Sequence, residues 1–194
     1  MKADKENIYN LPNALSAFRL LTFPALIYLI LTKKGDWFAI LLCINLVTDI
    51  LDGWIARAWK LQTALGAKLD SLADISVYIA AFWGVFTFKQ VEIGEMVHWL
   101  WPFVGLFVIA HTISFIRFGK LPSLHLYSSK VGGYIQGSFF FVLFAFQYVE
   151  PLFILALVSG YLSWIEEIIV LILLKEYRSN VKGLYWVLSQ NSGK

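Results

Sequence analysis

Six apolar stretches, each long enough or nearly long enough to cross a membrane, take up most of this chain of 194 residues. A helix needs about 20 residues to cross a hydrocarbon layer about 30 Å thick. Helix-interrupting residues, such as Gly94, Gly119 and Pro151, lie between the stretches. The pattern predicts an all-α polytopic membrane protein, a bundle of six transmembrane helices at Leu15–Leu31, Trp37–Ala56, Leu69–Phe88, Val97–Phe118, Val131–Val149 and Leu152–Leu174.

The composition supports a membrane location. Hydrophobic residues make up 59% of the chain and charged residues only 15%, whereas a soluble domain has about 25% charged residues. A soluble core of this size could not bury so much apolar surface, so lipid must cover part of it. A net charge of +3 gives no reason to expect nucleic acid as a partner. Without an internal repeat or a linker, we expect residues 1–194 to form a single domain.

The distribution of basic residues predicts the orientation. If the N-terminus is cytoplasmic, the segments on that side carry 12 lysines and arginines, and the opposite loops carry 3, namely Lys33, Lys34 and Lys89. Both termini are therefore predicted to be cytoplasmic. The basic residues assigned to the cytoplasmic side are Lys2, Lys5, Arg57, Lys60, Lys68, Arg117, Lys120, Lys130, Lys175, Arg178, Lys182 and Lys194.

Four aspartates lie in two of the apolar stretches. Asp49 and Asp52 are three residues apart, and Asp70 and Asp74 are four apart, so each pair shares one helix face. An ionised aspartate in the middle of a membrane helix costs about 2.5–3.5 kcal/mol. We therefore expect all four to face a hydrated cavity near the cytoplasmic ends of their helices.

The same aspartates predict a metal site. Arg57 and Lys68 are the only cations close to them in the sequence, so much of their charge is expected to remain unpaired. Carboxylates held close together need a cation or a proton between them. Oxygen ligands without histidine or cysteine favour Mg²⁺ or Mn²⁺. The alternative is a set of ordinary salt-bridged charges at the membrane surface.

Two glycines and an arginine accompany the aspartates. Gly53 follows Asp52 directly, Gly66 lies one turn before Asp70, and Arg57 lies one turn beyond Gly53. Glycine in a membrane helix permits close helix contact, and this is the simpler explanation. Beside a metal it also lets a bulky ligand approach the backbone, and an arginine there can bind phosphate. Together these residues indicate a diphosphate site.

The full pattern resembles a family signature. Asp-x-x-Asp-Gly-x-x-Ala-Arg, then eight residues, then Gly-x-x-x-Asp-x-x-x-Asp is the signature of the CDP-alcohol phosphatidyltransferases. This chain has every fixed residue of it: Asp49, Asp52, Gly53, Ala56, Arg57, Gly66, Asp70 and Asp74. The segment Leu11–Arg19 also resembles the sequence before the first helix of many bacterial members, and the size and six-helix count agree.

The resemblance implies a function. Such enzymes transfer a phosphatidyl group from CDP-diacylglycerol to a small alcohol, release CMP, depend on Mg²⁺ or Mn²⁺, and form homodimers in the cytoplasmic membrane with the active site facing the cytoplasm. By position, the metal ligands would be Asp49, Asp52, Asp70 and Asp74. Asp74 would also be the catalytic residue that activates the acceptor hydroxyl. The residues lining CDP would be Gly53, Ala56, Arg57 and Gly66.

The acceptor is less constrained. Asp70-Ser-Leu-Ala-Asp74 is more similar to phosphatidylserine synthases than to the Asp-Pro-x-Ala-Asp-Lys of many phosphatidylglycerophosphate synthases, a weak lean toward serine. Glycerol 3-phosphate and an inositol phosphate remain open. Arg117 and Lys130 could hold an acceptor phosphate, although anchoring at the cytoplasmic surface explains them equally well. The sequence does not assign roles to His111, His125, Glu166 and Glu167.

Two other functions remain open. An intramembrane prenyltransferase also pairs aspartates with a magnesium diphosphate, but it is longer and has no place for the Gly-x-x-Ala-Arg element. An ion-coupled transporter also carries acids inside the membrane, but such proteins tend to have inverted repeats and broken helices. This sequence shows neither feature.

We expect a membrane-impermeant amine reagent to modify Lys120 and Lys130 only in inverted or broken cells, because both lie in segments predicted to be cytoplasmic. The measurement is mass spectrometry of the protein after labelling intact and broken cells. Lys33 and Lys34, on the predicted opposite side, serve as the matched control. Labelling of Lys120 or Lys130 in intact cells would overturn the predicted topology.

Overall fold

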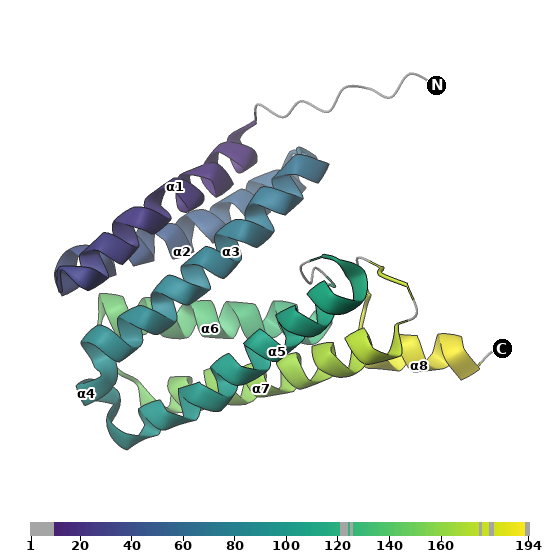
Figure 1. The fold of residues 1–194 in the computed structure, drawn as a ribbon. Coiled ribbons are helices and arrows are strands. Elements are labelled where there is room, and N and C mark those ends of the chain that lie inside the picture. The colour runs from purple at the N-terminus through teal and green to yellow at the C-terminus, as the bar shows by residue number, and fades with distance from the viewer. Residues whose placement is uncertain (1–9, 121–123, 125, 175, 179–180, 193–194) are drawn as a thin grey trace. The chain divides into compact units, whose positions relative to one another are not determined.

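The computed structural model describes residues 10–120, 124, 126–174, 176–178 and 181–192, and these residues form an all-helical fold (Figure 1). Six of their helices have 19 to 24 residues, which confirms the predicted helical class and agrees with the predicted count. They are α1 (Leu11–Leu31), α2 (Gly35–Ala58), α3 (Ala64–Gly84), α5 (Leu100–Phe118), α6 (Tyr127–Ala145) and α7 (Glu150–Leu173). Lys2, Lys5, His125, Lys175 and Lys194 lie outside the described residues.

Two helices begin four residues earlier than predicted. The first begins at Leu11 because the Asn10 side chain accepts a hydrogen bond from the backbone N–H of Asn13, 2.9 Å away, and caps the helix. The fifth begins at Tyr127 rather than Val131. Its polar first turn is compatible with the bundle because acidic side chains of α7 accept hydrogen bonds from its serines. Counting apolar residues alone misses both starts.

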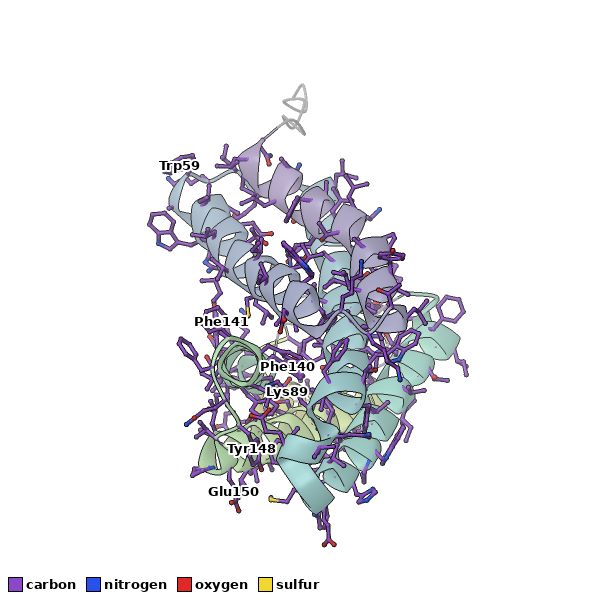
Figure 2. The ribbon with its side chains drawn as sticks, turned by 90° about the vertical axis from the view of Figure 1, so that its left-hand side faces the viewer. Trp59, Lys89, Phe140, Phe141, Tyr148 and Glu150 are labelled. Carbon is purple, nitrogen blue, oxygen red and sulfur yellow. The ribbon has the colours of Figure 1, made fainter. Side chains whose placement is uncertain are left out.

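The third helix continues beyond its predicted end. A π-helical segment (η1, Val85–Lys89) and a short helix (α4, Gln90–Ile93) follow α3 without a break. An ion pair of 2.7 Å between Lys89, labelled in Figure 2, and Glu92 lies in this extension. The chain turns at Gly94, whose φ of +68° favours glycine, and a 3₁₀ segment (η2, Gly94–Trp99) leads into α5. The predicted break at Gly94 is therefore confirmed.

Four helical segments among the described residues are long and apolar enough to cross a membrane: Leu11–Leu31, Gly35–Ala58, Ala64–Phe118 and Glu150–Leu173. The third of these contains both α3 and α5. Trp59, at the end of α2, leaves 61% of its surface exposed, as expected for an aromatic residue at a membrane interface (Figure 2). The orientation of the termini stays a prediction.

The chain divides into two compact units, and the prediction of a single domain remains untested. Unit 1 comprises residues 1–92 and 140–147, and unit 2 comprises residues 93–139 and 148–194. In unit 1, α1 packs against both α2 and α3 around buried side chains such as Leu26, Phe38 and Leu42. In unit 2, α5 packs against α7, and α8 (Leu184–Ser192) joins their core through Val187. All predicted metal and CDP residues lie in unit 1.

Candidate active site

The four predicted aspartates converge on a single guanidinium group, that of Arg19 on α1. Its Nη2 lies 2.6 Å from Asp52 Oδ2 and 2.7 Å from Asp70 Oδ1. Its Nη1 lies 2.9 Å from Asp74 Oδ1 and also contacts Asp49 Oδ1. The side chain of Arg19 is only 1% exposed. The structure thus brings together all four residues that the sequence assigned to a metal site.

The expectation that Arg57 and Lys68 are the cations nearest to the aspartates is wrong, because Arg19 takes that place. Within the part of the chain that the structure describes, neither of those two forms an ion pair. Sequence proximity failed because Arg19 lies 30 residues before Asp49 and reaches it only through the packing of α1 against α2. One signal was available: Arg19 is the only charged residue of α1, and a charge inside a membrane helix requires a partner.

Polar contacts at regular spacing hold α1 against α2. The Ser16 hydroxyl donates a 3.1 Å hydrogen bond to Asp52, and the Thr22 hydroxyl donates a 2.9 Å hydrogen bond to Asn45. Arg19 lies midway between Ser16 and Thr22 on α1. Its guanidinium bonds to Asp49, which lies between Asn45 and Asp52 on α2. Spacings of three or four residues place each series on one helix face. The contacts therefore fix the register that brings Arg19 to the carboxylates.

Three of the carboxylates remain open to solvent. The side chains of Asp49, Asp70 and Asp74 are 45%, 42% and 48% exposed, and one oxygen of each lies within 4.8 Å of the others. Asp52 is 5% exposed and is held by Arg19 and Ser16. A single guanidinium leaves a formal charge of −3 on the cluster. Accessible carboxylate oxygens with excess negative charge are a donor set that fits Mg²⁺ or Mn²⁺.

The two signature glycines have different surroundings. A Cβ atom on Gly53 would lie 3.3 Å from Nη1 of Arg57, the mobile end of an exposed side chain. A Cβ atom on Gly66 would overlap Oδ1 of Asn13 and lie 2.9 Å from Oγ1 of Thr63. Gly66 is thus required where α1 meets α3, whereas the backbone at Gly53 faces only a flexible arginine. Ala56, the remaining predicted CDP residue, is half-buried on α2.

Asparagine side chains fix the start of α1 to the start of α3. Nδ2 of Asn13 donates a 3.2 Å hydrogen bond to Oγ1 of Thr63, and Nδ2 of Asn10 donates a 3.3 Å hydrogen bond to the carbonyl of Leu61. Thr63 in turn caps α3 by accepting a 2.9 Å hydrogen bond from the N–H of Gly66. The starts of α1 and α3 are therefore held together by contacts that do not involve the carboxylates.

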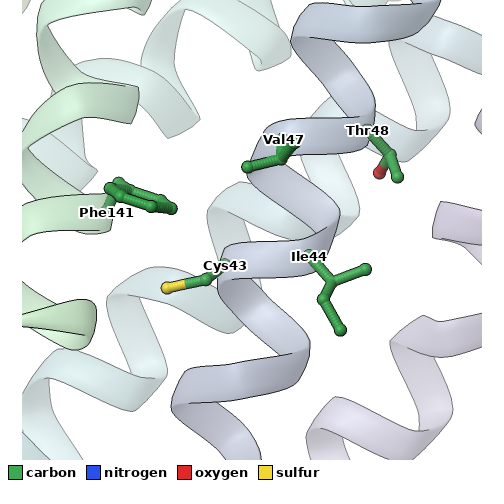
Figure 3. A pocket seen from close by; sticks show the side chains of 5 residues that line it. All are labelled: Cys43, Ile44, Val47, Thr48 and Phe141. Carbon is green, nitrogen blue, oxygen red and sulfur yellow. The ribbon is translucent and has the colours of Figure 1, made fainter.

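An apolar pocket of about 250 Å³ lies beside α2 in unit 1 (Figure 3). Its lining residues are Cys43, Ile44, Val47, Thr48 and Phe141. The α2 part of the lining ends at Thr48, directly before Asp49. An apolar surface and the first of the aspartates therefore lie next to one another in the sequence of α2.

The predicted acceptor residues lie in unit 2. The guanidinium of Arg117 donates hydrogen bonds to the last carbonyls of α7, those of Leu171 (3.0 Å), Ile172 (2.6 Å) and Leu174 (3.2 Å). The Nζ atom of Lys130 lies 5.9 Å from the centre of the Tyr127 ring. These contacts describe how unit 2 holds the two cations, and their role in acceptor binding stays a prediction.

Three polar residues of unit 2 without an assigned role have structural partners. Nδ1 of His111 lies 2.9 Å from the carbonyl oxygen of Phe107. Glu166 accepts a 2.8 Å hydrogen bond from the N–H of Leu184 at the start of α8 and another from the Ser128 hydroxyl. Glu167 accepts a 3.3 Å hydrogen bond from the Ser129 hydroxyl. The glutamates of α7 thus join α7 to the first turns of α6 and α8.

Comparison with known proteins identifies relatives of this chain. A family model described as CDP-alcohol phosphatidyltransferase matches residues 9–174. A CDP-diacylglycerol–glycerol-3-phosphate 3-phosphatidyltransferase of Cereibacter sphaeroides is 40% identical over 77 residues, 38% of this chain and 35% of the relative. The protein of that name in Escherichia coli K12 is 38% identical over 69 residues, 34% of this chain and 38% of the relative. The matched region thus spans about a third of these relatives, and no solved structure matches.

The different surroundings of Gly53 and Gly66 predict that alanine affects stability differently at the two positions. We expect Gly66→Ala to lower the free energy of unfolding by about 1–3 kcal/mol, because the added methyl group overlaps the hydrogen-bonded Asn13 side chain. Gly53→Ala is the matched control and should leave stability nearly unchanged, since the Arg57 guanidinium can move away. Thermal unfolding of the purified variants without substrate measures both. Equal stability of the two variants would contradict this packing argument.

Proposed function

Because the chain belongs to the CDP-alcohol phosphatidyltransferase family, we propose that it transfers a phosphatidyl group from CDP-diacylglycerol to a small alcohol and releases CMP. The observation that carries the proposal is the convergence of Asp49, Asp52, Asp70 and Asp74 on the buried guanidinium of Arg19. Three of these residues, Asp49, Asp70 and Asp74, have accessible carboxylates, and one oxygen of each lies close to the other two. Such a site suits a substrate that arrives with a diphosphate and divalent metal.

We assign metal binding to the four aspartates. The accessible carboxylates of Asp49, Asp70 and Asp74 can contact an ion directly, and Asp52 holds the cluster from its buried side. Mg²⁺ or Mn²⁺ is the ion that oxygen-only ligands favour. When bound, the ion would stabilise negative charge on the diphosphate.

Asp74 is the residue we assign to proton transfer. Its carboxylate is 48% exposed, so an acceptor hydroxyl can approach it. Asp74 would accept the hydroxyl proton while the acceptor oxygen bonds to the phosphorus of the phosphatidyl group. The bond between that phosphorus and the bridging oxygen of the diphosphate breaks, and CMP carries away the electron pair.

The remaining signature residues are proposed to hold CDP. Arg57 is exposed, lies over Gly53, and forms no ion pair with the residues that the structure describes, so its guanidinium can bind a phosphate. Gly53 offers a backbone that a ligand can approach once Arg57 moves. Ala56 and Gly66 complete the proposed lining.

Glycerol 3-phosphate is the acceptor we propose. It is part of the names of the matched relatives from Cereibacter sphaeroides and Escherichia coli, and nothing in those matches supports the lean toward serine. Ser71 and Ile75 depart from the Asp-Pro-x-Ala-Asp-Lys pattern. We therefore treat glycerol 3-phosphate as the first acceptor to test, with serine and an inositol phosphate as competitors.

We further propose a cytoplasmic-membrane location, a cytoplasmic active site and a homodimer. The location is supported by the four helical segments that can cross a membrane and by the basic residues of the predicted cytoplasmic side. The dimer rests on the family resemblance alone. Large apolar side chains are exposed on every long helix, which suits contact with lipid or with a second copy.

We expect Asp74→Asn to lower the transfer rate by about 100-fold or more while CDP-diacylglycerol still binds, because the variant loses only the proton acceptor. Asp52→Asn should instead weaken binding of the lipid, because the buried carboxylate of Asp52 supports the aspartate cluster that is proposed to bind metal. Equilibrium binding of the lipid and single-turnover CMP release separate the two effects. Equal losses of binding in both variants would show that the two roles are not divided in this way.

The function itself is tested by CMP release from CDP-diacylglycerol. We expect release by the purified protein with glycerol 3-phosphate and Mg²⁺ or Mn²⁺, and none in excess chelator. Serine and an inositol phosphate are run in parallel to identify the acceptor, and release of diphosphate from a prenyl diphosphate is measured separately to test the prenyltransferase alternative. Full turnover in chelator, with no metal in the protein, would refute the metal assignment, and an absence of CMP release with every acceptor would refute the proposed reaction.

A further inference from the structure

Arg19 occupies the position where a cation bound to all four aspartates would sit. Two nitrogen atoms of one guanidinium contact four carboxylates from two helices, with three of the contacts between 2.6 and 2.9 Å. Three of those carboxylates, on Asp49, Asp70 and Asp74, are the ones close enough to share an ion. We propose that Arg19 is a resident counter-ion that holds the metal site in the absence of divalent metal and competes with the metal for the same carboxylates.

The charge of the cluster explains why a resident cation is needed. Asp52 is 5% exposed and its three partners are about half exposed, so water shields them incompletely. Four carboxylates at this distance repel one another unless a cation or a proton lies between them. Arg19 is the only charged residue of α1, and no other described cation contacts the cluster. Without Arg19 or another cation, the carboxylates of α2 and α3 would repel one another.

The contacts of Arg19 also explain how metal could replace it. Its Nε atom is buried and has no hydrogen-bond partner among the described residues. Within the described part of the chain, only carboxylates hold the guanidinium, and no backbone carbonyl or neutral side chain bonds to it. A divalent ion that takes over the carboxylate oxygens removes what holds Arg19 and repels its positive charge.

The opposite possibility is that Arg19 is a permanent part of the loaded site. In that case removing its charge would leave metal affinity unchanged or lower it, because the poorer positioning of the carboxylates would offset the weaker repulsion of the ion. The competition model requires the reverse. The two models therefore differ in the sign of one measurable quantity, the affinity of the substrate-free protein for divalent metal.

The test compares Arg19→Gln with wild-type protein, purified in detergent without substrate and stripped of metal. Mn²⁺ affinity is measured from the electron paramagnetic resonance signal of the free ion, and stability from tryptophan fluorescence during heating. We expect Arg19→Gln to bind Mn²⁺ about 10-fold more tightly, since it removes the competing cation. Without metal the variant should unfold at a lower temperature than wild type, and Mn²⁺ should restore more of its stability than it adds to wild type.

Lys68→Gln is the matched control. Lys68 is exposed on α3, two residues before Asp70, and forms no ion pair with the described residues. The variant removes the same charge near the site without removing a carboxylate contact, so its Mn²⁺ affinity should change far less than that of Arg19→Gln. A similar gain in both variants would mean that general electrostatics, rather than direct competition, controls affinity, and would overturn the proposal.

Arg19→Lys keeps the test decisive if Arg19→Gln does not fold. Lysine retains the charge but has one nitrogen in place of the two that bridge the four carboxylates, so its Mn²⁺ affinity should lie between those of wild type and Arg19→Gln. Affinity equal to or below that of wild type in the variants that fold would refute competition.

This proposal rests on the metal site of the proposed function, and the two can fail separately. CMP release by the wild type that depends on metal, together with unchanged Mn²⁺ affinity in the Arg19 variants, would refute competition alone. Failure of every protein to bind Mn²⁺ would refute both the competition and the metal site. Binding of Mn²⁺ by Arg19→Gln but not by wild type would support competition in its strongest form.

Discussion

The contact between the Arg19 guanidinium and four carboxylates determines how unit 1 is arranged. Arg19 comes from α1, and its partners come from α2 and α3, so a single side chain joins all three helices. A buried ion cluster of this kind contributes less to stability than its Coulomb energy suggests, because burying the charges costs solvation. Removing one partner is nevertheless costly, since the others remain unpaired. The cluster therefore acts mainly to specify which helices meet, and in which register.

The helix termini on the aspartate side are organised by a different set of contacts. Asn13 and Thr63 join the starts of α1 and α3 by hydrogen bonds between neutral side chains, and Gly66 leaves the space that Asn13 occupies. These contacts involve no charged group. The site thus combines a neutral frame at the helix ends with a charged interior. Under the proposed competition between Arg19 and metal, only the interior has to rearrange.

Spacing within the sequence was enough to predict the four aspartates as one cluster, because residues three or four apart share a helix face. It could not identify Arg19, whose partners lie 30 residues or more away and depend on how α1 packs. Hydropathy likewise placed the long helices but missed the start of α6, because Ser128 counts against a membrane helix until Glu166 is known to accept its hydrogen bond. The division into two units has no signal in the sequence that we could identify. What could not be predicted is in each case a contact between distant segments.

The position of the aspartate cluster along α2 and α3 explains how charged side chains can lie in an apolar helix bundle. Asp52 lies six residues before the end of α2 at Ala58, about 9 Å along the helix, and Asp70 lies six residues after the start of α3 at Ala64. Both pairs of carboxylates are therefore close to the same end of their helices, where water reaches them and the cost of a charge falls. The apolar pocket at Cys43–Thr48 lies further along α2, away from that end. In the proposed reaction, the diphosphate can stay hydrated at the carboxylates while the acyl chains of the same lipid remain in the membrane, so no charged group has to enter the hydrocarbon.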